Sequence, residues 1–139
     1  MTRQPPQPVI LDTNIVLDLL VFNDVAARPL KKALEAGELK WIATQPMRDE
    51  LARVLAYPKI VLRLAYYQLS AQDVLAGFDE QVRLTDVAAP AHASCSDPDD
   101  QKFIDLAVAH QAILLSKDRA VLCMAKRLLS HAVTAQATL

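Results

Sequence analysis

Residues 9–14 of the chain read VILDTN, and this stretch decides the fold. Val9-Ile10-Leu11 is an uninterrupted apolar run with two β-branched residues, which is typical of a short buried strand. The next apolar run, from Ile15 to Phe22, has the length and composition of a helix that Thr13 or Asn14 is placed to cap. A strand followed at once by a helix predicts the first half of a βαβ unit in a parallel sheet.

The same alternation continues along the rest of the chain. A helix is expected from about Val25 to Ala36, because Gly37 is a suitable residue to end it. The other expected elements are strands at 40–43, 82–87, 114–115 and 132–134, and helices at 47–56, within 59–81, at 97–110 and at 120–129. Strands that alternate with helices require right-handed crossovers. The prediction is a three-layer α/β/α sandwich with a central, mainly parallel sheet.

Length and composition limit the possible functions. A chain of 139 residues is expected to form a single domain, here preceded by an extended lead-in over residues 1–8 that contains three prolines. Only two glycines are present, and no glycine-rich phosphate loop can be found. The net charge of −1 excludes a polycation that binds nucleic acid through bulk electrostatics. No transmembrane segment or signal peptide is evident, so a cytoplasmic protein is expected.

Four acidic residues are predicted to lie at one edge of the sheet. Asp12 and Asp118 follow expected strands, whereas Glu50 and Asp100 lie near the beginning of expected helices. The eighteen positions from Asp100 to Asp118 fit this placement, because roughly eleven helical residues and four to five strand residues cover similar lengths in opposite directions. Ligands of open α/β sheets bind at the carboxyl ends of the strands. Clustered carboxylates repel one another unless a cation lies among them, so we expect a Mg²⁺ or Mn²⁺ site.

Each of these acids also has a simpler explanation when taken alone. Asp97, Asp99 and Asp100 all lie where a helix N-terminus favours negative charge, and Asp97 is a plausible cap. Asp118 is compatible with a turn or cap position, Asp12 with the end of a strand, and Glu50 with an exposed helical glutamate. These explanations do not account for carboxylates from four separate elements meeting at one edge, and the joint pattern therefore favours the metal site.

The motifs LDTN, PMRDEL, DPDDQKFIDLAVA and LLSKD, in this order, resemble the motif set of the PIN-domain ribonucleases. More narrowly, they are similar to the VapC-like toxins of toxin–antitoxin pairs. The resemblance extends from Val9 to Thr134. It implies a metal-dependent endoribonuclease in which Asp12, Glu50, Asp100 and Asp118 hold Mg²⁺ or Mn²⁺. It also implies an RNA substrate, a small antitoxin partner and a homodimer.

Residues next to the acidic quartet are expected to support it. Asn14 matches the polar residue that follows the first aspartate of the family, and Ser116 stands where the family most often has threonine. Both are assigned to a supporting shell around the metal, where the Ser116 hydroxyl can orient Asp118. Basic residues near the motifs are candidates for contacts with RNA phosphates or else solvated neighbours that balance the acids: Arg48, Lys102, Lys117 and Arg119.

Two alternatives remain at the level of sequence. The first is an aspartate-based phosphotransfer domain, either a receiver or a haloacid-dehalogenase-like phosphatase, because both place an aspartate after the first strand. The phosphatases need a second aspartate where this chain has Asn14, and a receiver needs adjacent acids that LDTN lacks. The second alternative is a non-catalytic PIN module that binds a protein or RNA partner.

Overall fold

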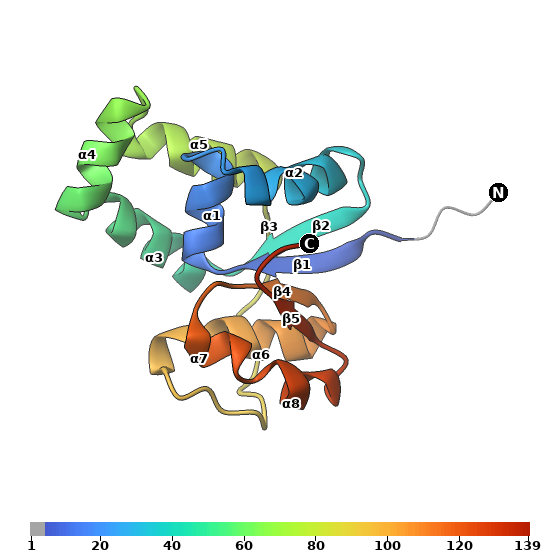
Figure 1. Ribbon diagram of the computed structural model, residues 1–139. Coiled ribbons are helices and arrows are strands. Elements are labelled where there is room, and N and C mark those ends of the chain that lie inside the picture. Colours follow the sequence, from blue (N-terminus) through green and yellow to red (C-terminus); the bar gives the residue numbers. More distant parts are fainter. Residues whose placement is uncertain (1–4) are drawn as a thin grey trace.

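A single parallel sheet organises the chain, of which the computed structural model describes residues 5–139 (Figure 1). The strands lie in the order β3-β2-β1-β4-β5, and all four pairings are parallel. Their bounds are β1 Gln7–Leu11, β2 Leu39–Ala43, β3 Arg83–Leu84, β4 Ile113–Leu115 and β5 Thr134–Gln136. Because β1 has β2 on one side and β4 on the other, the strand order reverses there. Such a reversal opens a crevice at the carboxyl ends of the strands.

Helices cover both faces of this sheet and make the three layers (Figure 1). One layer contains α1 Thr13–Leu20, α2 Arg28–Glu35, α3 Gln45–Leu55, α4 Pro58–Tyr66 and α5 Ala71–Gln81. The opposite layer contains α6 Gln101–His110, α7 Arg119–Leu122 and α8 Ala125–Leu129. Two short 3-10 turns, Val25–Ala27 and Pro98–Asp100, precede α2 and α6. The predicted α/β fold with a central parallel sheet is confirmed.

The core lies between the sheet and each helical layer. The middle strands are buried on both faces, as Val9, Ile10 and Leu114 illustrate. In the first layer the ring of Phe78 meets Trp41 edge-on, with the ring centroids 5.3 Å apart. Apolar residues buried on both sides of a strand are typical of a parallel sheet. The strands are therefore rigidly held, and the residues that follow them have defined positions.

Several element boundaries differ from the sequence-based expectation. Strand β1 begins at Gln7, inside the expected lead-in, of which residues 1–4 lie outside the described part. Helix α1 begins at Thr13 and is capped by Asp12, not by Thr13 or Asn14. The last strand begins at Thr134 because Ala132 has a φ of +60°, a left-handed conformation that no strand residue adopts.

Other expected elements are shorter or divided. Edge strand β3 keeps only Arg83 and Leu84 of the predicted 82–87, and both residues are exposed. The predicted helix 25–36 is a 3-10 turn capped by Asp24 and followed by α2, while the predicted helix 120–129 is divided into α7 and α8.

Within residues 5–139 no helix has the length and apolarity needed to cross a membrane.

Candidate metal centre

The register between β1 and β4 brings two of the predicted acids together. Leu11 pairs with Leu115, and the backbone N–H of Asp12 donates to the Leu115 carbonyl oxygen at 2.9 Å. Asp12 thus leaves β1 at the level where Ser116 leaves β4, and Asp118 follows two residues later. The reversal of strand order therefore places both aspartates at the mouth of the same crevice.

Asp12 is a buried carboxylate that hydrogen bonds hold in one orientation. Its Oδ1 accepts from the Thr13 N–H at 2.6 Å, and its Oδ2 accepts from the Ser116 hydroxyl at 2.6 Å. The same hydroxyl oxygen accepts from the Asp118 N–H at 3.0 Å. Ser116, itself fully buried, consequently connects the two aspartates and fixes their relative position. Ser116 therefore orients Asp12 through its side chain and Asp118 through its backbone N–H.

Asp100 reaches the same place from the opposite layer, at the end of the 3-10 turn that leads into α6. The residue is 6 % exposed, and its Oδ2 is buried without a hydrogen-bond donor among residues 5–139. Asp97, by contrast, accepts from the Asp99 N–H at 2.9 Å and caps the turn. Asp118 caps α7 by accepting from the Ala120 N–H at 2.9 Å. Of the three neighbouring acids on the 97–100 segment, Asp100 is the one that faces the crevice.

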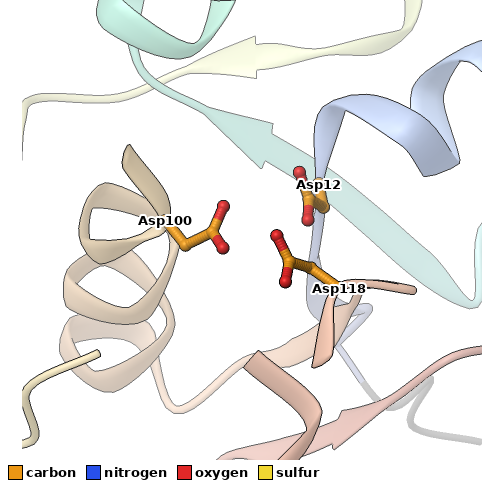
Figure 2. A group of neighbouring side chains, drawn as sticks. All are labelled: Asp12, Asp100 and Asp118. Carbon is orange, nitrogen blue, oxygen red and sulfur yellow. The ribbon is translucent and has the colours of Figure 1, made fainter. Parts of the chain in front are cut away.

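Asp12, Asp100 and Asp118 form a compact oxygen cluster (Figure 2). One carboxylate oxygen from each residue lies within 4.8 Å of those of the other two. Figure 2 shows the three side chains converging from the start of α1, the start of α6 and the segment before α7. All the ligand atoms that the cluster offers are carboxylate oxygens. One oxygen of these three residues, Asp100 Oδ2, accepts no hydrogen bond from residues 5–139. Both features fit a hard divalent cation such as Mg²⁺ or Mn²⁺.

Crowding changes the proton affinity of two members of the cluster. Burial raises the pKa of Asp12, although the hydrogen bonds from Ser116 and Thr13 oppose this effect. The pKa of Asp100 rises to about 8, first because the carboxyl is buried and second because a proton on it can be shared with the Asp118 carboxylate. The charges of Asp12, Asp118 and Asp97 raise it further. At neutral pH the metal-free cluster therefore retains a proton on Asp100. A bound cation would favour the loss of that proton.

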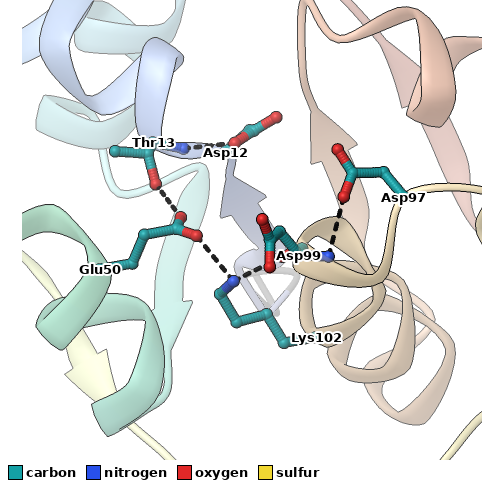
Figure 3. A network of polar contacts seen from close by, with 6 residues as sticks. All are labelled: Asp12, Thr13, Glu50, Asp97, Asp99 and Lys102. Atoms are coloured by element: carbon teal, nitrogen blue, oxygen red, sulfur yellow. Dashed lines mark hydrogen bonds and ion pairs between the residues drawn. The ribbon is translucent and has the colours of Figure 1, made fainter. Parts of the chain in front are cut away.

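The fourth predicted acid, Glu50 on α3, lies beside the cluster and has two partners of its own (Figure 3). One carboxylate oxygen accepts from the Thr13 hydroxyl, and the other contacts the Lys102 Nζ at 2.8 Å. Lys102 also donates to the Asp99 carbonyl oxygen. Glu50 thus connects α3 to α1 and α6, the helices that follow Asp12 and Asp100. Its carboxylate is not part of the group of three.

A PIN-domain family model matches residues 8–120 of the chain. The chain belongs to the PIN-domain family. A comparison with curated proteins finds no match. Membership places the protein in a nuclease superfamily whose members use divalent metals, in agreement with the acidic cluster. It also removes the receiver and haloacid-dehalogenase alternatives, whose first strands end in the same residue type.

The four basic residues predicted near the motifs of this PIN domain are placed differently from one another. Arg48 forms a two-point contact with Asp79 on α5 at 2.8 and 2.9 Å, and this hydrogen bonding raises the pKa of Arg48. Lys102 contacts Glu50, and Lys117 contacts Asp18 at 2.6 Å. Arg119 is exposed and has no ion pair among residues 5–139. Asn14 is exposed on the first turn of α1.

Sequence reasoning missed two polar residues of the PIN domain that stand close to the acids. The sequence predicts only a helix-capping role for Thr13. In the structure the Thr13 hydroxyl donates to the Glu50 carboxylate. Asp18 is buried and binds Lys117. A signal for Asp18 exists in the sequence, because it is the one acid in the apolar segment 15–22. Acids on such segments need a partner when they are buried.

A larger cavity of about 580 Å³ lies at the amino ends of the strands, lined in part by Pro6, Leu39 and Arg83. Because these residues begin their strands or precede them, the cavity is at the opposite edge of the sheet from the three aspartates. Its size alone does not make it the functional site. The candidate centre of this PIN domain is the carboxylate cluster, which is open at the carboxyl edge.

Proposed function

We propose that this PIN domain is an endoribonuclease that hydrolyses RNA phosphodiester bonds with Mg²⁺ or Mn²⁺. The supporting observation is the convergence of Asp12, Asp100 and Asp118, with one Asp100 oxygen buried and lacking a donor. An RNA backbone brings phosphate oxygens, which share hard divalent ions with carboxylates in nuclease sites. The sequence has no glycine-rich phosphate loop that would explain phosphate binding by other means.

In this proposal the chain's own residues prepare the site. Asp12, Asp100 and Asp118 supply the ligand oxygens, and Ser116 keeps Asp12 and Asp118 at a fixed separation. A bound cation would favour the charged form of Asp100 and so oppose the burial and the neighbouring carboxylates that raise its pKa. A bound divalent ion supplies Lewis-acid charge for the phosphate and lowers the pKa of water next to it. Asn14 and Arg119, both exposed at this edge, are proposed to contact the substrate.

Glu50 is proposed as the fourth acid of the site, with a role that depends on its partners. Its carboxylate holds the Thr13 hydroxyl next to Asp12 and the Lys102 ammonium next to the 97–100 turn. A metal bound directly by Glu50 would compete with its contacts to Thr13 and Lys102. In the present arrangement it orients the elements that carry the ligands, and Lys102 is freed for a phosphate only when that contact opens.

Cleavage of single-stranded RNA by the purified protein tests the proposal. We expect manganese-dependent cleavage that EDTA stops and that Asp12→Asn abolishes, whereas Asp99→Asn, an exposed neighbour, retains it. Cleavage that survives EDTA, or that persists in Asp12→Asn, contradicts the mechanism. Thermal melting of the same proteins with manganese reports whether the ion binds. A non-catalytic PIN module would be stabilised by manganese and cleave no RNA.

We further propose that the protein is the toxin of a toxin–antitoxin pair, a cytoplasmic homodimer that a small antitoxin inhibits. The motif resemblance to VapC-like toxins supports this role, and exposed apolar residues on α4 offer a surface for a partner protomer. Induced expression in a bacterial host should arrest growth for the wild type and not for Asp12→Asn. Equal growth of both strains contradicts the toxin role and leaves the nuclease proposal standing.

A further inference from the structure

A second hollow lies directly beside the acidic cluster. It is a cavity of about 340 Å³ between α1, the segment after α1, α4 and the segment after β4. Asn14, two residues after Asp12, and Lys117, one residue before Asp118, both line it. The residues that line the cavity are Asn14, Leu17, Asp18, Phe22, Asp24, Ile60, Arg63 and Lys117. The cavity and the aspartates therefore share the first turn of α1 and the segment after β4.

The wall formed by α4 carries a cation–π pair. The guanidinium carbon of Arg63 lies 3.7 Å from the centroid of the Phe22 ring. Phe22 is partly buried, and Tyr67 packs against it with the ring centroids 6.0 Å apart. Arg63 itself is exposed. Phe22 thus holds the Arg63 guanidinium against its ring while the Arg63 side chain stays exposed.

Of the two cationic residues that line the cavity, Arg63 is the one without a carboxylate partner among residues 5–139. Lys117 is paired with Asp18, and Asp24 accepts from the Ala26 N–H at the start of the 3-10 turn. Arg63 has no ion pair within the described range 5–139. Asn14 adds an exposed amide, able to donate and to accept, at the side nearest Asp12.

We propose that this cavity is a base-binding subsite, in which an unpaired nucleobase next to the cleaved phosphate stacks on the Arg63 guanidinium. Unpaired bases of RNA stack on aromatic rings and on arginine planes, and the volume is in the range of small-ligand sites. The position of the cavity accounts for its role, since a base that enters it draws the adjacent phosphate toward the aspartates. The inference rests on the proposed RNA substrate and deepens it, because it assigns recognition of a base to residues outside the acidic motifs.

Stacking and simple charge attraction give different results in a conservative variant. Arg63→Lys retains the positive charge and loses the plane, whereas Phe22→Leu retains an apolar side chain and loses the ring that supports the plane. Arg127→Lys is the matched control, because Arg127 is an exposed arginine on α8 outside the cavity lining. Circular dichroism melting verifies that the three variants are folded.

The experiment measures binding of short single-stranded RNAs in which one abasic position moves along the strand. Fluorescence anisotropy is recorded with calcium in place of manganese, so that binding is read without cleavage. For the wild type we expect one position at which loss of the base weakens binding by about tenfold, the effect of a lost base stack. Arg63→Lys and Phe22→Leu should bind the intact RNA about tenfold more weakly and no longer respond to the abasic position. Arg127→Lys should behave as the wild type does.

The outcomes separate the subsite from the proposed function. An abasic penalty that is equal in the wild type and in Arg63→Lys overturns the subsite, as does a wild type that tolerates an abasic residue at every position. Manganese-dependent cleavage is recorded on the same RNAs. Cleavage by the wild type without any base effect removes the subsite alone. A base effect that depends on Arg63, in a protein that cleaves no RNA, removes the nuclease proposal and supports the subsite.

Discussion

Asp100 is the residue whose pKa is raised most by burial together with the neighbouring carboxylates. Its pKa is about 8 in the fold, whereas an ordinary aspartate has a value of 3.8. Between these two pH values the folded state retains a proton that the unfolded state has lost. The free energy of unfolding of the metal-free protein therefore falls as pH rises from about 4 to about 8. Manganese should restore it, because the ion binds only the folded site.

Asp100→Asn should remove this dependence on pH. The amide carries no charge, so at pH 8 the metal-free variant should be more stable than the wild type by at least about 1 kcal/mol, since one pKa unit corresponds to about 1.4 kcal/mol. It should lose the stabilisation by manganese and the cleavage activity. Thermal and urea unfolding at pH 5 and pH 8, with and without manganese, measure these changes. Asp99→Asn is the matched control. A wild type whose metal-free stability is the same at both pH values contradicts this account.

Glu50 can be distinguished from the three aspartates by its effect on metal affinity. Because its oxygens contact Thr13 and Lys102, Glu50→Gln should weaken manganese binding by about tenfold, the usual effect of losing a group that orients a ligand. Asp12→Asn removes a ligand charge and should abolish detectable binding. Calorimetric titration of both variants with manganese makes the comparison. If both lose binding equally, Glu50 is a direct ligand and the Lys102 contact opens in the loaded site.

At the scale of elements, the turn that precedes α6 depends on its cap. The Asp97 side chain accepts from the Asp99 N–H at 2.9 Å, and loss of such a cap costs about 1 kcal/mol. Asp97→Ala should therefore lower the free energy of unfolding by that amount and leave manganese-dependent cleavage in place. Asp97→Asn retains the cap oxygen and should retain the stability. Asp99→Ala removes a charge of the same sign from an exposed side chain and should change stability by less than about 0.5 kcal/mol. If Asp97→Ala is instead as stable as the wild type and inactive, Asp97 and not Asp100 is the metal ligand of the 97–100 segment.

The elements also show how far the sequence determines this structure. Apolar runs closed by polar residues located β1, β2 and β4, because a strand buried on both faces must be continuously apolar. The position of Asp100 followed from opposing helix and strand lengths, a matter of chain geometry alone. The left-handed Ala132 and the capping role of Asp12 could not be read in advance, since they depend on how tertiary packing positions each chain reversal. The contact of Glu50 with Lys102 joins residues 52 positions apart and has no local signal.

At the scale of the whole molecule, one surface is more apolar than a free protein face usually is. Leu62 and Tyr66 on α4 are 73 % and 81 % exposed, and Tyr57 and Val61 add to the same helix and its cap. Leu64, on the same helix, is buried and belongs to the core. The remaining residues form the face that we propose for a second protomer. With a net charge of −1, two protomers repel each other little through their overall charge.

Light scattering at micromolar concentration should therefore give the mass of a dimer for the wild type. Leu62→Lys places a charge in the middle of this α4 face, where burial against a partner would be costly, and should shift the protein to a monomer. Leu129→Lys makes the same change at an exposed leucine on α8, in the opposite helical layer, and should leave the dimer intact. A monomer mass for the wild type contradicts the dimer. Loss of the dimer in both variants would show that association does not use α4, because a contact specific to that helix cannot be sensitive to a charge on the far layer.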